Sequence, residues 1–379
     1  DDDQSIYKFR GANIYNILNF ENVFTGAKVI KLEQNYRSTQ TILNAANAVI
    51  SNNIGRKSKS LWTDNGEGEK VNYTLYENGY DEAEGVASGI AEYVRDGWNY
   101  NDVAILYRTN AQSRALEEKL MIHNIPYKIY GGQNFYQRKE IKDILAYLKT
   151  IDNGLDGQAV KRIINVPKRG IGNTTIDRLQ EYADFNDITF WEALVNAKDI
   201  DTIKNAALSK LEPFVDLIGR LRAKEEFMSL KELAEAVIED TGYIESLSQN
   251  ETVEEVEARR ENLDEFINKV VSYEEGCKEA GEEPTLSGLL EEVALIADID
   301  NLDESEPHVM LMTLHSAKGL EFPIVYMTGM EDGLFPSYMT IVSDDSTEIE
   351  EERRLCYVGI TRAEKILNLT SAKSRMVRG

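Results

Sequence analysis

Short runs rich in β-branched and aromatic residues alternate with amphipathic helical patterns over residues 28–136. The runs are KVIKL (28–32), VNYTLY (71–76) and DVAILY (102–107). The helical patterns that follow them are STQTILNAANAVI (38–50), DEAEGVASGIAEYVRDG (81–97) and NAQSRALEEKLMIHN (110–124). This alternation is typical of βαβ units on a parallel sheet. For the first helix we expect Ser38 as N-cap and an inward stripe of Ile42, Ala45, Ala46, Val49 and Ile50.

The pattern changes at residue 137 and changes back near residue 301. Residues 137–300 carry long, Glu-rich amphipathic stretches with hardly any strand alternation, which predicts a mostly helical domain. Strand-like runs return after Pro307 as VMLMT (309–313), IVYMT (324–328) and ILNLT (366–370), around a helix candidate at 348–360. We therefore predict an α/β parallel-sheet domain that is interrupted by a large, mostly helical insertion.

The chain's length and composition agree with more than one domain in a soluble protein. It has 379 residues, of which 42% are hydrophobic, and this is too long for one compact core. Cys277 and Cys356 lie far apart, which indicates neither a zinc site nor a disulfide framework. No apolar run reaches the roughly 18 to 20 residues that cross a bilayer. We expect a cytoplasmic protein that does not contact membranes.

The net charge of −24 is concentrated in one segment. Residues 225–306 hold 26 Asp/Glu against 5 Lys/Arg, which leaves 40 acids against 37 bases in the rest of the chain. Such a run is most often a solvated helical face, and DNA mimicry is the less common alternative. Outside this segment the chain is close to neutral and carries local basic groups, so phosphate binding stays open.

NYRST, residues 35–39, is the first candidate for chemistry. It follows an apolar run and precedes a helix, which is where open α/β sheets bind ligands. Arg37 is suited to a forked contact with phosphate oxygens, and Tyr36 is suited to lie against a base. The alternative is an arginine that pairs with a nearby acid beside a tyrosine at the core edge.

TLHSAKGLEF, residues 313–322, also follows a predicted strand. Ser316, Ala317 and Gly319 allow backbone N–H groups to approach an anion closely, and ionisable groups surround them, namely Lys318, His315 and Glu321. A plain turn is the alternative. The chain has only three histidines, which supports neither a metal cluster nor a Ser-His-Asp triad.

YVGITRAEK, residues 357–365, places Arg362 in a short connection after a predicted helix. A guanidinium on such a loop suits insertion toward a phosphate that another domain binds. Stabilising the charge of a transferring phosphoryl group in this way is worth ~10³ to 10⁵ in rate. An ordinary surface arginine is the alternative.

Together these segments are far more specific than any one of them. In the order DxDQSIYxxRGA, LxxNYRST, YRTNAQSR, TLHSAKGLEF and YVGITRAE, the sequence resembles superfamily 1 DNA helicases of the UvrD/Rep/PcrA group over essentially the whole chain. The resemblance implies a tail of a first RecA-like motor domain (1–27) and a second RecA-like domain in two parts (28–136 and 301–379). It also implies an inserted helical accessory domain (137–300).

The resemblance assigns the opening DDDQSIYKFRGA, residues 1–12, to a motif that links nucleotide to DNA. Gln4 would sense the γ-phosphate, and Tyr7, Phe9 and Arg10 would contact single-stranded DNA. The family usually has Trp where this chain has Phe9. Exposed rings offer sequence-tolerant stacking worth ~1 to 3 kcal/mol per base.

By the same resemblance, Tyr36 would stack on adenine, and Arg37 and Arg362 would contact the γ-phosphate. Glu321 and Gly319 would lie near the nucleotide, and His315 near DNA. Residues 130–143 correspond to the junction with the inserted domain.

In VPKRGIGNTTIDRL (166–179) the Gly-Ile-Gly turn before a helix is typical of a helix-hairpin-helix element. Its contacts to duplex phosphates would come from backbone N–H groups and from Lys168, Arg169, Gly170, Gly172 and Thr174. A simple helix-capping turn is the alternative.

A P-loop is absent from the sequence, since the dipeptide Gly-Lys occurs nowhere. We expect the Mg²⁺-binding acids to lie upstream of residue 1, so the acids at 1–3 are not that pair. ATP and Mg²⁺ are therefore expected in a longer parent protein that includes an N-terminal RecA-like domain. The chain alone is expected to be inactive as an ATPase.

The resemblance implies a parent that moves 3′ to 5′ on single-stranded DNA and unwinds duplex in repair and replication, with repair or transcription proteins as further partners. A non-catalytic module that binds DNA or protein is one alternative. A helicase-like subunit of a recombination nuclease is another, and it fits less well because no nuclease carboxylate/Lys cluster is visible.

Overall fold

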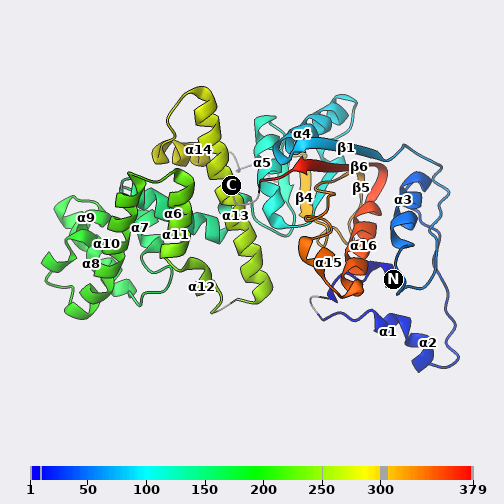
Figure 1. Ribbon diagram of the computed structural model, residues 1–379, viewed down its shortest axis with the longest axis horizontal. Coiled ribbons are helices and arrows are strands. Elements are labelled where there is room, and N and C mark those ends of the chain that lie inside the picture. Colours follow the sequence, from blue (N-terminus) through cyan, green and yellow to red (C-terminus); the bar gives the residue numbers. More distant parts are fainter. Residues whose placement is uncertain (1, 9–10, 250, 299–305, 377–379) are drawn as a thin grey trace. The chain divides into compact units, whose positions relative to one another are not determined.

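The computed structural model describes residues 2–8, 11–249, 251–298 and 306–376. The chain forms two compact units (Figure 1). Unit 1 comprises Asp1–Asn134 and Leu302–Arg375, and unit 2 comprises Phe135–Asn301 and Met376–Gly379. No described helix combines the length and the apolar character needed to cross a membrane.

Unit 1 is built on a six-stranded sheet in which every pairing is parallel. The strand order is β1-β6-β5-β2-β4-β3. The strands are β1 (Asn72–Asn78), β2 (Val103–Tyr107), β3 (Tyr127–Ile129), β4 (Val309–Thr313), β5 (Phe322–Met327) and β6 (Ala363–Ser374). The two segments of unit 1 are interleaved in the sheet, because β4, β5 and β6 come from its second segment and each pairs with at least one strand of the first.

The central strand β2 shows why the sheet is buried on both faces. All five of its residues are buried. Ala104 and Leu106 pack in one core cluster with α3 (Gln40–Ile50) and α16 (Ser346–Ile360). Val103, Ile105 and Tyr107 pack in the other with α4 (Gly79–Arg95) and α5 (Ser113–Ile122). Successive side chains of a strand point to opposite faces, so helices cover both sides of this parallel sheet.

The remaining described helices of unit 1 are short. They are η1 (Asp2–Gln4), α1 (Tyr15–Leu18), α2 (Phe20–Val23), η3 (Tyr100–Asp102), η4 (Asn110–Gln112) and α15 (Tyr338–Val342). The predicted stripe of α3 is confirmed, because Ile42, Ala46 and Ile50 are buried and Ala45 and Val49 pack against the same core.

The regular elements in the described part of unit 2 are all helices. Its elements are η5 (Phe135–Gln137), α6 (Lys139–Asp152), α7 (Gly157–Ile163), α8 (Asn173–Asn186), α9 (Phe190–Val195), η6 (Ala197–Asp199), α10 (Asn205–Glu225), α11 (Leu230–Asp240), α12 (Tyr243–Leu247), α13 (Val253–Ala280) and α14 (Leu286–Asp298). One apolar core runs through them. The predicted fold class, a parallel-sheet domain interrupted by a helical insertion, is confirmed.

Two local predictions are wrong. KVIKL (28–32) forms no strand, and its apolar side chains Ile30 and Leu32 are exposed because no neighbouring strand is present to cover them. Ser38 does not cap α3, because its hydroxyl instead donates to the carbonyl of Ala363 at 2.6 Å. The N-cap is Thr39, and its side chain makes no capping hydrogen bond.

Candidate functional site

The candidate site lies in unit 1, at the amino ends of β5 and β6. Glu321 directly precedes β5, and Arg362 directly precedes β6. The two strands begin side by side, since the backbone N–H of Phe322 donates to the carbonyl of Arg362 at 3.0 Å. Arg37 lies on the loop before α3 and is not preceded by a strand, so the prediction that it follows a strand's carboxyl end is wrong.

Arg37 reaches this edge from its loop. The Asn35 side-chain oxygen accepts from the backbone N–H groups of Arg37 and Ser38, each at 2.9 Å, and this fixes the turn. The Arg37 guanidinium donates to the Glu321 carboxylate at 2.5 Å and to the Thr361 carbonyl at 3.1 Å. It keeps about a quarter of its side chain in solvent, at 26% exposed, so part of the fork is accessible.

Arg362 comes from the connection between α16 and β6 and is 3% exposed. Its guanidinium donates to the carbonyls of Val358 at 3.0 Å and Leu320 at 2.9 Å, and to the Thr361 hydroxyl at 3.1 Å. The structure therefore brings both predicted arginines to one residue, Thr361. Arg37 contacts its carbonyl and Arg362 contacts its hydroxyl.

The electrostatics of Arg362 favour an added anion. Burial and, next, the charge of Arg37 lower its pKa to about 10, and Glu321 offsets only part of this. A phosphate placed against both guanidiniums would oppose their repulsion and supply charge-assisted hydrogen bonds. Glu321 is the competing anion, and it is largely exposed.

Tyr36 and Gly319 are open to solvent at this edge. Tyr36 is 80% exposed, and its hydroxyl donates to the Gln34 side chain at 2.9 Å. An exposed ring held at its tip is suited to stacking on a base. Gly319 has φ +95° with nothing within 4 Å of the place a Cβ would occupy, so an anion can approach its backbone.

A second group gathers Gln4, Tyr7, His315 and Lys318. The Tyr7 hydroxyl donates to the carbonyl of His315 at 3.2 Å, and the two ring centroids are 6.2 Å apart. The Lys318 ammonium donates to the Gln4 carbonyl at 2.8 Å and lies 5.3 Å from the centre of the Tyr7 ring. Burial and the charge of Arg362 lower the pKa of Lys318, which links the two groups electrostatically. The predicted DNA contacts Phe9 and Arg10 lie outside the described residues.

The predicted duplex contacts lie in unit 2, on the loop between α7 and α8 and, for Thr174, in the first turn of α8. Lys168, Gly170, Gly172 and Thr174 are exposed. Gly172 is the N-cap of α8. Gly170 has φ +72°, a backbone conformation that favours glycine at that position.

Arg169 is placed differently from its neighbours. Its guanidinium donates to the Ile163 carbonyl at 2.9 Å and to the Tyr147 hydroxyl at 2.7 Å, and it lies 5.0 Å from the Phe214 ring centre. In this structure Arg169 shapes the loop, and Lys168 is its exposed cation.

Sequence reasoning did not single out two residues that organise the site, Asn35 and Thr361, although both lie inside the quoted segments. For Asn35, an Asx-type amide before an Arg-Ser pair was a usable signal. Thr361 gave no such signal, because its role depends on a backbone carbonyl.

Two other features bear on ligands. Among the described residues, no group of three or more His, Cys, Asp or Glu side chains could hold a metal ion. A cavity of about 340 Å³ lies away from both arginines, between residues 5–18 and α16, and its lining includes Ser5, Lys8, Glu351 and Arg354.

Comparison with known proteins adds a family and a set of relatives. Residues 30–374 match the model of the UvrD-like helicase C-terminal domain, and residues 1–25 match that of the UvrD/REP helicase N-terminal domain. Over all 379 residues the chain is 50% identical to the ATP-dependent DNA helicase PcrA of Staphylococcus aureus (strain Mu50 / ATCC 700699). It is 49% identical to the protein of the same name from Staphylococcus epidermidis (strain ATCC 12228 / FDA PCI 1200). It covers 51% of each, so the chain spans about half the length of the curated relatives it matches.

Proposed function

Because the chain belongs to the family of UvrD-like helicases, we propose that it supplies the second motor domain and the inserted domain of an ATP-dependent DNA helicase. In this proposal the first motor domain, of which residues 1–27 are the tail, supplies the P-loop and the Mg²⁺ ligands. The observation that carries the proposal is the convergence of Arg37 and Arg362 on Thr361, together with the exposed ring of Tyr36 next to Arg37 in the chain.

ATP binds between the two motor domains in this mechanism. Tyr36 stacks on the adenine, Arg37 and Arg362 contact the γ-phosphate, and Glu321 and Gly319 lie beside the nucleotide. Mg²⁺ bound with ATP neutralises phosphate charge. The arginines act only when the nucleotide draws the domains together, so closure and hydrolysis are coupled.

The protein moves along single-stranded DNA. Tyr7, Phe9, Arg10 and His315 contact it by stacking and by backbone charge, and Gln4 joins that contact to the γ-phosphate. The Tyr7–His315–Lys318 group supports this role, because it sets an aromatic ring, an imidazole and a cation side by side. Alternating grip on the strand moves the protein 3′ to 5′ and unwinds duplex in repair and replication in the cytoplasm.

The test is a reconstitution. The purified chain is expected to hydrolyse ATP at background rate, and mixing it with the preceding Walker-containing segment is expected to produce DNA-stimulated hydrolysis. Arg362→Gln should lower the reconstituted kcat by ~10³ or more. Arg95→Gln is the matched control, because Arg95 is exposed and its described ion pair is with Glu92 on the same helix. DNA-stimulated turnover by the chain alone would contradict the proposal.

A second function, a duplex grip by unit 2, is favoured by the exposed Lys168 beside the Gly170–Gly172 turn. Lys168→Ala should weaken duplex binding uniformly across sequences and reduce the slope of log affinity against log salt by about 1. Lys198→Ala, at another exposed site of unit 2, should leave both unchanged. Equal effects of the two variants would count against a specific grip.

A further inference from the structure

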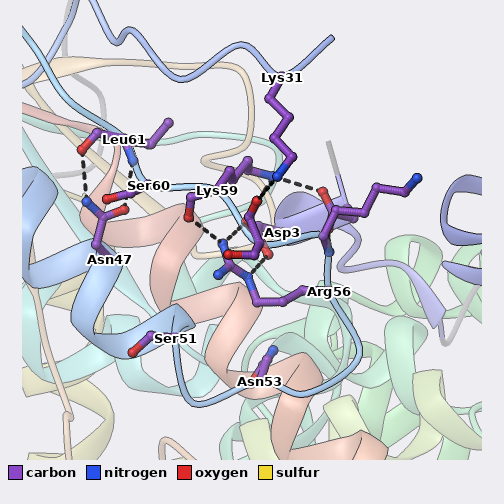
Figure 2. A network of polar contacts seen from close by, with 12 residues as sticks. Asp3, Lys31, Asn47, Ser51, Asn53, Arg56, Lys59, Ser60 and Leu61 are labelled. Carbon is purple, nitrogen blue, oxygen red and sulfur yellow. Dashed lines mark hydrogen bonds and ion pairs between the residues drawn. The ribbon is translucent and has the colours of Figure 1, made fainter. Parts of the chain in front are cut away.

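Residues 53–60, which we call the basic loop, form ion pairs with two buried acids from the start of the chain. Asp2 and Asp3 are 5% and 1% exposed. The Arg56 guanidinium grips Asp3 with both arms, at 2.8 Å from Nε to Oδ1 and 2.7 Å from Nη2 to Oδ2. The Lys59 ammonium bridges the acids, at 2.8 Å from Asp2 and 2.9 Å from Asp3. Figure 2 shows Asp3 lying between Arg56 and Lys59.

The backbone completes this contact. The N–H of Lys57 donates to the Asp2 carboxylate at 2.7 Å, and the carbonyl of Lys59 accepts from Arg56 at 3.2 Å. Burial alone would lower the pKa of Lys59, but its bonds to Asp2 and Asp3 outweigh burial and the pKa rises. The basic loop therefore binds these two carboxylates in one defined arrangement, which a basic stretch in solvent would not do.

The basic loop is tied on its other side to α16. The Glu350 carboxylate accepts from the N–H of Ile54 at 2.8 Å, and the Glu350 carbonyl accepts from the Asn53 amide at 2.8 Å. Arg354, one turn further along α16, donates to the Ser5 carbonyl at 2.8 Å. The same helix ends at Ile360, directly before Thr361 and Arg362.

These contacts form one continuous series. It runs from Arg362 through α16 to the basic loop, then to Asp2 and Asp3, and so to Gln4. On the far side of Gln4, Lys318 holds its carbonyl. Two anchors therefore fix the backbone on either side of the side chain that is proposed to sense the nucleotide.

Resting on the proposed function, we propose that Arg56 and Lys59 are positioning residues that hold Asp2 and Asp3 so that Gln4 stays in register with Arg362. Ion pairs suit a contact that forms and breaks as a protein moves, because the charged groups are well solvated when they separate. An apolar contact would instead leave an exposed hydrophobic patch that favours association. The two parallel hydrogen bonds from Arg56 also fix the orientation of the Asp3 carboxylate, which a hydrophobic contact would not do.

The first test uses the 379-residue chain and amide hydrogen exchange. In Arg56→Ala, the amides of Ser5 and Lys57 should exchange faster by a factor on the order of 10 or more, because the buried Asp3 carboxylate loses one of its two cationic partners and both arms of its bidentate contact. The amides of Val103–Tyr107 in β2 should be unchanged. Lys57→Ala is the control within the same loop, because its side chain pairs with Glu21 and not with either acid. Unchanged exchange at Ser5 and Lys57 would overturn the proposal, and so would an equal rise in β2.

The second test uses the complete protein that contains the chain. Arg56→Ala and Lys59→Ala should lower kcat of DNA-stimulated ATP hydrolysis by about tenfold or more, with KM for ATP within about twofold, because Gln4 acts after binding. Arg56→Lys should recover part of kcat, since it restores charge without the fork. A fall in stability with normal kcat would overturn the positioning role. If Arg56→Ala does not fold, Asp3→Asn and Arg56→Lys test the same contact.

The two tests separate the inference from the function on which it rests. Absence of ATP hydrolysis by the wild-type complete protein would contradict the proposed function and leave the exchange result standing. Normal wild-type hydrolysis with unaffected variants would contradict the positioning role alone.

Discussion

In the proposed function, Glu321 would compete with a phosphate for Arg37. Its carboxylate lies 2.5 Å from the Arg37 guanidinium, at an exposed edge where the same guanidinium would meet a nucleotide. Removing this negative charge frees the fork of Arg37 and removes repulsion toward a polyanion. The free energy involved is that of a partly exposed ion pair, about 1 kcal/mol or less.

Glu321→Gln should therefore bind a triphosphate more tightly, by about two- to fivefold at low salt, with the difference shrinking as salt rises. Titration calorimetry of the chain, mixed with the preceding Walker-containing segment, against a non-hydrolysable ATP analogue measures it. Glu364→Gln is the control, because Glu364 lies two residues beyond Arg362 on β6 and forms no ion pair with a described residue. Weaker binding by Glu321→Gln would mean that the carboxylate orients Arg37 and does not compete for it.

The sequence predicted which side chains lie at the site. It did not predict their orientations, which depend on packing in the folded protein. Arg37, Arg362 and Glu321 were selected from sequence and lie together. The inward turn of Arg169 toward Tyr147 and Phe214 was not foreseen, because an arginine that braces its own loop has the same sequence signature as one that binds phosphate.

The start of α16 depends on one exposed carboxylate. Asp345 is the N-cap and accepts from the Thr347 N–H at 2.9 Å, and Lys8 donates to it at 3.2 Å. The bonds from Thr347, followed by Lys8, lower the pKa of Asp345 to about 2.

A lowered folded-state pKa means that this contribution is fully present above about pH 4, near the ordinary value, and is lost as the pH falls toward 2. Amides in the first turn of α16 should exchange faster over that window, and the carboxyl carbon of Asp345 should titrate near 2 by NMR. Asp345→Ala should show the fast exchange already at neutral pH. Titration of Asp345 near 4 would contradict the prediction.

The carboxyl end of β6 is joined to α4 by an ionic group. Arg375 pairs with Glu82, which is 3% exposed, and with Glu331. Glu82 also accepts from the Gly329 N–H at 3.0 Å and the Thr370 hydroxyl at 2.6 Å.

Arg375→Ala leaves Glu82 buried without its cation, so the free energy of unfolding of unit 1 should fall by about 3 to 5 kcal/mol. Urea denaturation followed by circular dichroism measures this change. Lys373→Ala, whose partner Glu77 is exposed, should cost less than about 1 kcal/mol. Similar losses in the two variants would show that the burial of Glu82 is not what matters.

At the level of elements, the strands predicted from VNYTLY, DVAILY, VMLMT, IVYMT and ILNLT are present, and KVIKL is not a strand. The pattern of a short apolar run indicates only that its side chains favour burial, and in residues 28–32 Ile30 and Leu32 remain exposed. Whether another strand lies beside it depends on the rest of the fold, and for residues 28–32 none does.

The whole chain consists of two units that each have a core of their own. The switch in hydrophobic period near residues 137 and 301 predicted this division. The strand order was beyond sequence reasoning, because parallel pairings join residues as distant as Asn72 and Asn368.

Replacing residues 135–301 with a flexible linker of about ten residues should leave the sheet of unit 1 intact, because β3 and β4 are neighbours and parallel strands need a connection of about a dozen residues. Amide exchange in β2 should remain as slow as in the full chain. Loss of protection there would mean that the sheet requires unit 2.

The pairing of β1 with β6 also governs the order in which the protein can mature. During synthesis β1 emerges almost three hundred residues before β6, its partner in the described sheet, and β3 is complete before the helical insertion that precedes its partner β4. A ribosome-bound chain thus carries open strand edges while unit 2 is completed, and these edges are templates for unwanted association. Nascent chains of this protein should depend on shielding by chaperones until the last strand is released.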